Sequence, residues 1–149
     1  HRGGANGTAR RVADALDGLC VEPTDEMDVH LWKKLSVNAA INPVTALTGL
    51  RNGEAVERAE DVMRSAAHEV EAVAAKRGVK LEGAPERAVE VAEATADNVS
   101  STLQDVRAGR RTEIDALNGY VVDLAEETGV QAPVNRTLVS LVRAIGRTK

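Results

Sequence analysis

Cysteine and aromatic residues are nearly absent from this sequence, and each absence excludes a kind of architecture. Cys20 is the single cysteine among 149 residues, so no disulfide can form within the chain, and such scarcity is typical of the reducing cytoplasm. The aromatic side chains are Trp32 and Tyr120 alone, with no phenylalanine. The core must therefore consist of alanine, valine and leucine, which favours closely packed helices. We expect a cytoplasmic, mostly helical protein.

The sequence also lacks a basic excess, a long apolar run and a metal-binding pattern. Its net charge is −4, which predicts neither a nucleic-acid partner nor attraction to an anionic membrane. No apolar run approaches the length of a membrane span, and no signal-peptide pattern opens the chain. The three histidines are scattered, without a cysteine or carboxylate cluster at metal spacing, so we expect no metal.

A dinucleotide-binding fingerprint is missing as well. No G-x-G-x-x-G follows a candidate strand, and the early glycines have neither that spacing nor a strand before them. Residues 8–18 predict a short helix and residues 19–23 a strand, and a lone strand can neither satisfy its backbone nor bury its faces. We interpret residues 1–24 as the end of an α/β unit whose remainder is absent, and residues 25–149 as an all-helical domain.

From Thr24 onward the periodicity predicts helices throughout. Apolar residues recur at helical spacing, and glycine or proline marks the breaks. Pro43 should end or kink the first long helix, and Gly119 indicates that another backbone packs closely against its own helix. The expected helices span residues 24–41, 43–47, 54–77, 85–96, 98–108, 112–128 and 137–145.

Lys34, Asn38 and Asn42 recur every four residues. On a helix each is turned by about 40° from the last and lies about 6 Å further along, so the three polar heads share one face. Asparagine is a poor helix former, which makes it an unusual choice for a solvated stripe. Only five of the 19 basic residues are lysine, and lysine, unlike arginine, can donate a proton at accessible pH. We interpret this face as the wall of a substrate-binding cleft, with an ordinary solvated face as the alternative.

A second polar stripe follows in the helix expected over residues 98–108. Asn98, Ser101 and Asp105 fall on one side of that helix, which favours a second wall of the cleft. The alternative is structural, since Asn98 or Ser100 also suits the N-cap position of the helix.

Glu113 is expected in the first turn of the next helix. Thr112 would cap this helix, with Asp115 close to a capping box. The helix dipole favours a carboxylate in the first turn, so a structural explanation for Glu113 competes with a functional one. The functional one is a partner for Lys34, because a lysine in a cleft keeps its charge when a carboxylate holds it.

Two segments of the sequence resemble the signatures of one known family. Residues 32–54, WKKLSVNAAINPVTALTGLRNGE, and residues 95–122, TADNVSSTLQDVRAGRRTEIDALNGYVV, are similar to the two signatures of the C-terminal domain of ketopantoate reductase. The resemblance covers about residues 8–140. It implies a helical bundle of the 6-phosphogluconate dehydrogenase-like superfamily, preceded in residues 1–24 by the end of a Rossmann domain.

The resemblance also implies an activity and roles for the polar residues. The family reduces ketopantoate with NADPH, as the 2-dehydropantoate 2-reductase of pantothenate and coenzyme A biosynthesis. By this resemblance Lys34 is the proton donor, and Glu113 pairs with it and with the substrate. The residues that correspond to ligands of the substrate's hydroxyl and carboxylate groups are Asn38, Asn42, Asn98 and Ser101. NADPH would be bound mainly by the absent domain, so we expect this chain alone not to transfer hydride.

Three alternatives from different classes stay open. One is a related reductase that acts on another branched 2-oxo or 3-hydroxy acid. Another is a helical binding module that has lost catalysis. The third is an oligomerisation domain, suggested by the alanine-rich apolar stripe of the helix expected over residues 54–77. A homodimer is one assembly that this alternative allows. A glycine-rich fingerprint in the coding sequence upstream would favour the reductases.

Overall fold

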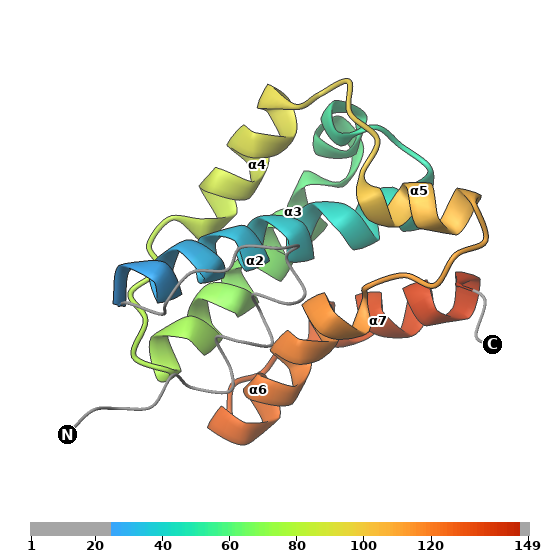
Figure 1. Cartoon of the computed structure of the whole chain (residues 1–149). Coiled ribbons are helices and arrows are strands. Elements are labelled where there is room, and N and C mark those ends of the chain that lie inside the picture. Colours follow the sequence, from blue (N-terminus) through green and yellow to red (C-terminus); the bar gives the residue numbers. More distant parts are fainter. Residues whose placement is uncertain (1–24, 147–149) are drawn as a thin grey trace.

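The computed structural model describes residues 25–146, which form helices and connecting turns without a strand in that range (Figure 1). This result confirms the mostly helical fold class. The helix and strand expected within residues 8–23, together with the α/β remnant assigned to residues 1–24, lie outside the described residues. The elements are α2 (Asp25–Thr48), α3 (Asn52–Lys76), α4 (Ala84–Ala94), α5 (Ser101–Arg107), the π-helix η1 (Asp115–Gly119), α6 (Tyr120–Thr128) and α7 (Pro133–Ile145).

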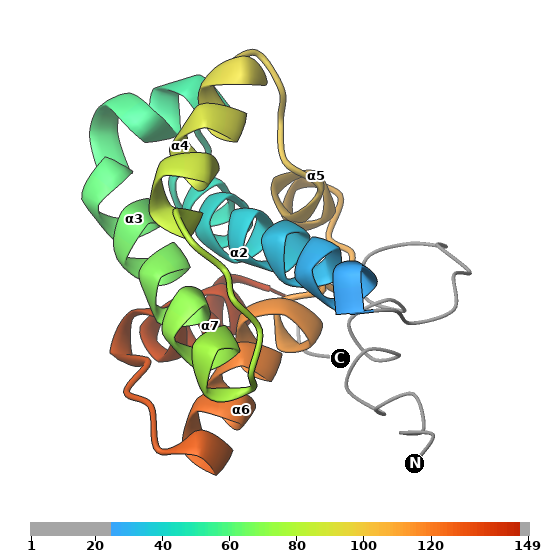
Figure 2. The same ribbon diagram turned by 90° about the vertical axis from the view of Figure 1, so that its left-hand side faces the viewer.

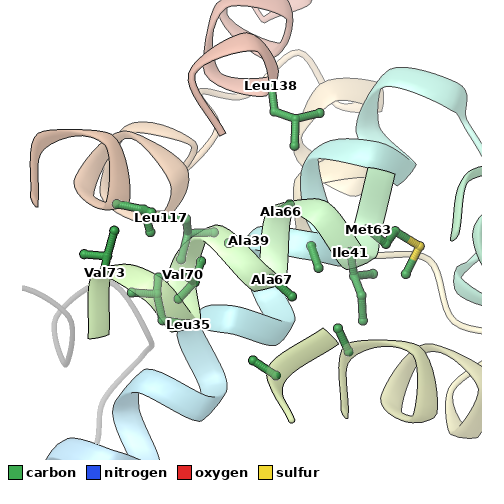
Figure 3. Close-up of a cluster of buried hydrophobic side chains, with 14 of the residues drawn as sticks. Leu35, Ala39, Ile41, Met63, Ala66, Ala67, Val70, Val73, Leu117 and Leu138 are labelled. Atoms are coloured by element: carbon green, nitrogen blue, oxygen red, sulfur yellow. The ribbon is translucent and has the colours of Figure 1, made fainter. Parts of the chain in front are cut away.

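Helix α2 is the centre of the bundle. Helices α3, α4, α5 and α7 all pack against it, and Figures 1 and 2 show it surrounded by its neighbours. Leu35 and Ala39 on its apolar side are fully buried in one cluster with Ala66 and Val70 of α3 (Figure 3). Alanine at such contacts lets the helix axes approach closely, so that a core without phenylalanine still reaches normal packing density. The polar stripe predicted on α2 therefore stands on a helix that is fixed from several sides.

Helix α3 is the long helix expected from the sequence, although it begins two residues earlier. A kink at Ala59, where φ is −144° and ψ is 26°, interrupts it near its start. The start of α3 lies against the turn that follows α4, because the Gly53 amide donates to the Ala96 carbonyl at 3.0 Å. A Cβ atom on Gly53 would lie 2.6 Å from the Ala96 Cβ atom, so this close approach requires glycine.

Pro43 does not end its helix, contrary to the expected break into two helices at this proline. Helix α2 continues through Pro43 to Thr48, so the two helices expected over residues 24–41 and 43–47 are one. A proline has no N–H to donate to the carbonyl one turn before it, which here belongs to Ala39. The Asn118 side chain supplies the missing donor, since its Nδ2 atom lies 2.8 Å from the Ala39 carbonyl oxygen. A tertiary hydrogen bond thus replaces the lost helical one.

The helix expected over residues 112–128 is also different in the structure. Residues 112–114 are not helical, and η1 comes before α6. In η1 the Gly119 amide donates to the carbonyl of Ile114, five residues back, at 2.9 Å, which is the bonding pattern of a π-helix. The atoms nearest to a Cβ on Gly119 belong to this same turn. The prediction that another backbone packs against Gly119 was therefore wrong.

The remaining helices differ from the prediction mainly at their starts. Helix α5 begins at Ser101 because the Ser100 hydroxyl accepts the Leu103 amide at 3.2 Å, which confirms Ser100 as the N-cap. Helix α7 begins at Pro133 instead of Thr137, and proline is favourable in a first helical turn. Buried Glu69 of α3 holds this start, since its carboxylate accepts the Val134 amide at 2.9 Å.

Candidate functional site

The three residues of the stripe on α2 differ in exposure along the helix. Lys34 is exposed, Asn38 is half-buried and Asn42 is buried, with 8% of its surface accessible. Because α2 is helical across all three, their four-residue spacing places them along one side, as the sequence predicted. The stripe therefore runs from solvent into the bundle, with an ammonium group at its outer end and an amide at its inner end.

A buried pair of hydroxyls brings the start of α5 to this inner end. The Oγ1 atom of Thr45 lies 2.6 Å from the Oγ atom of Ser100. The Thr45 hydroxyl also lies within hydrogen-bond distance of the Asn42 carbonyl, at 3.1 Å, so it can donate to its own helix while it accepts from Ser100. Ser101 follows Ser100 directly and is exposed. The structure thus brings Ser101 to the end of α2 that carries Asn42.

Asn98 does not lie on a helix, contrary to the prediction that it shares a stripe with Ser101 and Asp105. It precedes α5 in a non-helical segment, and its carbonyl accepts the Asn52 amide at 3.1 Å. Its side chain is exposed. The sequence reasoning missed Asn52, whose buried Nδ2 donates to Thr95 at 2.9 Å, and whose Oδ1 has no hydrogen-bond partner among the described residues.

Glu113 is exposed and lies just before η1 instead of inside the first turn of an α-helix. Its carbonyl accepts the amides of Ala116 and Leu117 at 3.0 and 3.1 Å, so its backbone begins the π-helical segment. The expected capping box is not formed with Asp115, whose carboxylate accepts from Arg143 Nε of α7 at 2.7 Å. Both Glu113 and Lys34 have interaction partners in the structure.

Two charged residues of α5 make structural contacts, one to the turn after α2 and one within the same segment. The Arg107 side chain donates to the carbonyl of Gly49 at 3.2 Å and so ties the end of α5 to the turn after α2. Asp105, which the sequence placed on the polar stripe, pairs with Arg110 at 2.9 Å. These contacts give Arg107 and Asp105 structural roles beside the candidate site.

A buried polar network behind the stripe was not predicted. The Asn118 Nδ2 atom bonds both the Ala39 carbonyl and the Asn135 Oδ1 atom, each at 2.8 Å. Asn135 in turn donates to the Ala66 carbonyl at 3.1 Å and to the Glu69 carboxylate at 2.7 Å. The available signal was Pro43, because a proline inside a helix leaves a carbonyl that needs a donor from elsewhere.

The part of the chain that the structure describes contains neither a cluster of metal ligands nor a membrane-spanning helix. Within residues 25–146 no group of three or more histidine, cysteine, aspartate or glutamate side chains is placed to hold a metal ion. In the same range, no helix combines the length and the apolar character that a membrane span needs. The polar stripe of α2 and the adjoining start of α5 are the candidate site.

Solved structures with a similar fold are reductases and dehydrogenases. The PanE/ApbA family ketopantoate reductase from Ralstonia eutropha JMP134 is 42% identical, with a TM-score of 0.73 over 78% of this chain and 40% of that one. The ternary structure of D-mandelate dehydrogenase with NADH and anilino(oxo)acetate is 25% identical, with a TM-score of 0.74 over 95% of this chain and 49% of that one. The fold is therefore that of the helical domain of ketopantoate reductase and dehydrogenase-like proteins.

The sequence comparison then identifies the family. Residues 26–146 match the family described as "Ketopantoate reductase PanE/ApbA C terminal", and the chain belongs to it. The 2-dehydropantoate 2-reductase of Archaeoglobus fulgidus is 42% identical over 96% of this chain, and that of Pyrobaculum aerophilum is 43% identical over 89%. The matched regions cover 50% of each of these proteins, so the chain spans about half the length of the curated relatives it matches.

Proposed function

We propose that this chain is the C-terminal catalytic domain of an NADPH-dependent 2-dehydropantoate 2-reductase, which reduces ketopantoate to pantoate in pantothenate and coenzyme A biosynthesis. The observation that carries the proposal is the stripe of Lys34, Asn38 and Asn42 on the central helix, to which the buried bond between Thr45 and Ser100 attaches the start of α5. Membership of the ketopantoate reductase family supports this choice of substrate.

The cofactor is assigned to a second domain. Among the described residues no glycine-rich turn joins a strand to a helix, so this part of the chain offers no cradle for a pyrophosphate. The relatives are about twice as long as this chain, which supports a nucleotide-binding domain before residue 25, with residues 1–24 as its end. NADPH, held mainly by that domain, supplies the hydride when it is bound.

Lys34 is the proposed proton donor. Reduction of a 2-oxo group adds a hydride to the carbonyl carbon and a proton to its oxygen, and the Lys34 ammonium group would give that proton to the forming alkoxide. Glu113 would hold the ammonium group and the substrate, because a carboxylate beside a lysine favours its charged form. Both residues are exposed in this domain, which supports a cleft closed from the other side by the nucleotide-binding domain.

The neutral polar residues would orient the substrate. Ketopantoate carries a carboxylate and a hydroxyl group, and amides and hydroxyls bind both without adding a charge to the cleft. Asn42 is buried at the inner end of the stripe, which supports a role in binding the part of the substrate that enters deepest. The residues proposed to hold the carboxylate and the hydroxyl are Asn38, Asn42, Asn98 and Ser101.

The test measures NADPH oxidation in the presence of ketopantoate. It uses the protein with its upstream segment included. We expect Lys34→Ala and Glu113→Ala each to lower turnover by about 100-fold or more, because each removes part of the proton-donating pair. Lys33→Ala is the matched control for the first variant, since Lys33 is also exposed but is offset from the stripe. Glu93→Ala on α4 is the control for the second. Full activity of folded Lys34→Ala protein would overturn the role of the stripe.

A related reductase is the second candidate function. The fold similarity to the D-mandelate dehydrogenase solved with NADH and anilino(oxo)acetate favours it, because that similarity covers 95% of this chain. Activity with a phenyl-bearing 2-oxo acid and NADH, but not with ketopantoate, would replace the proposed substrate and keep the chemistry. A non-catalytic oligomerisation module would reduce neither acid, and its homodimer would be detected by sedimentation. We propose a cytoplasmic location with either reductase.

A further inference from the structure

The carbonyl of Ala39 is the point at which the candidate site depends on a distant residue. Pro43 cannot bond this carbonyl, and the Asn118 Nδ2 atom, 79 residues further along the chain, donates to it at 2.8 Å. Ala39 follows Asn38 directly, and Asn42 directly precedes Pro43. The bond from Asn118 therefore holds the one turn of α2 that carries both amides of the stripe.

The orientation of the Asn118 amide is fixed by a chain of donors and acceptors that ends at a carboxylate. Glu69 can only accept, so the Nδ2 atom of Asn135 must face it, at 2.7 Å. This leaves the Oδ1 atom of Asn135 turned toward Asn118, whose Nδ2 atom donates to it at 2.8 Å. Asn118 and Asn135 are fully buried. The amide of Asn118 thus presents its donor to Ala39 in one orientation only.

We propose that Asn118 is a positioning residue for the reductase reaction, because it holds the proline turn of α2 so that Asn38 and Asn42 meet the substrate. The inference rests on the proposed function of the stripe. Without the Asn118 donor, the Ala39 carbonyl is left buried without a partner, and the turn can relieve this only by moving. A displacement of about 1 Å at a substrate-positioning group is enough to cost about 100-fold in rate.

The structure supplies a specific rescue for the loss of Asn118. Asn118→Leu keeps the size of the side chain and removes the donor. Pro43→Ala restores an N–H at position 43, which can bond the Ala39 carbonyl as in an ordinary helix. The experiment compares the two single variants and the double variant in the protein with its upstream segment, with ketopantoate and NADPH. Val73→Ala, in the buried part of α3, is the control for a general loss of stability.

We expect Asn118→Leu to lower kcat/KM for ketopantoate by about 10-fold to 100-fold while the KM for NADPH stays unchanged. The double variant should recover most of the activity of Pro43→Ala. Its thermal midpoint should stay below that of Pro43→Ala, because the Asn135 Oδ1 atom remains without its donor. Val73→Ala should lower the thermal midpoint and leave kcat/KM unchanged.

Several results would overturn the inference. Folded Asn118→Leu protein with normal kcat/KM would exclude a positioning role, and loss of activity that Pro43→Ala does not rescue would show that the Ala39 carbonyl is not the reason. If Asn118→Leu does not fold, the double variant decides, since an active double variant supports the inference and an unfolded one overturns it.

If the wild-type protein is inactive with ketopantoate, the proposed function is wrong, but the positioning role of Asn118 can still be tested. The side-chain amide NMR signals of Asn38 and Asn42 then report the position of the turn. They should shift in Asn118→Leu and return toward those of Pro43→Ala in the double variant. Signals that do not move would overturn the inference independently of any activity.

Discussion

The hydroxyl oxygens of Thr45 and Ser100 lie 2.6 Å apart, and both residues are buried. This bond joins the second half of α2 to the N-cap of α5 across 55 residues of sequence. Ser100 also accepts the Leu103 amide, so one hydroxyl serves as a helix cap and as a contact between helices. The position of Ser101 beside the α2 stripe depends on it.

We expect Ser100→Ala to lower the free energy of unfolding by about 1–2 kcal/mol, because it removes an N-cap and one of the hydrogen bonds of the buried Thr45 hydroxyl. Thr45→Val should cost a similar amount. The two losses should not add in the double variant, since they share one bond. Urea unfolding of the four proteins measures this coupling. Thr48→Val is the matched control, because Thr48 is exposed; additive losses would mean that the two hydroxyls act separately.

Glu69 should be one of the most important charged residues for stability. Its carboxylate accepts the backbone amides of Val134 and Asn135, each at 2.9 Å, at the positive end of α7. We expect Glu69→Ala to cost about 2–3 kcal/mol, because buried donors lose a charged acceptor. Glu127→Ala, which removes a mostly exposed carboxylate, should cost less than about 0.5 kcal/mol. Equal midpoints in urea for the two variants would contradict this role of Glu69.

The contact between Gly53 and Ala96 predicts a steric effect that a second substitution relieves. Gly53→Ala would place a Cβ atom 2.6 Å from that of Ala96, so the start of α3 must move away. We expect a loss of about 1–3 kcal/mol, as for other over-packed sites. Adding Ala96→Gly should restore part of it, because the closest atom is then gone. Thermal unfolding of the three variants checks the order, and a double variant less stable than Gly53→Ala would refute the steric explanation.

Apolar periodicity was enough to predict the helical fold but not the interruptions within it. Glycine and proline marked most boundaries to within a few residues, because local rules decide where a surface turn falls. At Pro43 the local rule failed, since a tertiary donor from Asn118 compensates for the missing N–H. No pattern in a single sequence pairs two residues that are so far apart.

The arrangement of the candidate site was predicted correctly where it depends on one helix and incorrectly where it depends on contacts between helices. The spacing of Lys34, Asn38 and Asn42 is a property of one helix, and the structure retains it. Asn98 was misplaced because Ser100 caps α5 and so leaves Asn98 outside the helix. The contact between α2 and α5 through Thr45 depends on packing, which the sequence does not state. The catalytic role of the stripe stays a prediction until the variants are measured.

Because η1 is a π-helix, the number of residues in its turn determines which side chain faces α2. An α-helix advances by about 100° for each residue, so a turn with one extra residue rotates everything after it by a similar angle. Deletion of a single residue between Glu113 and Asn118 would therefore bring a different side chain opposite the Ala39 carbonyl. Surface loops in general tolerate changes in length, whereas this turn fixes an angular register. A shorter variant of this domain would need another donor for Ala39, or an α2 without its proline.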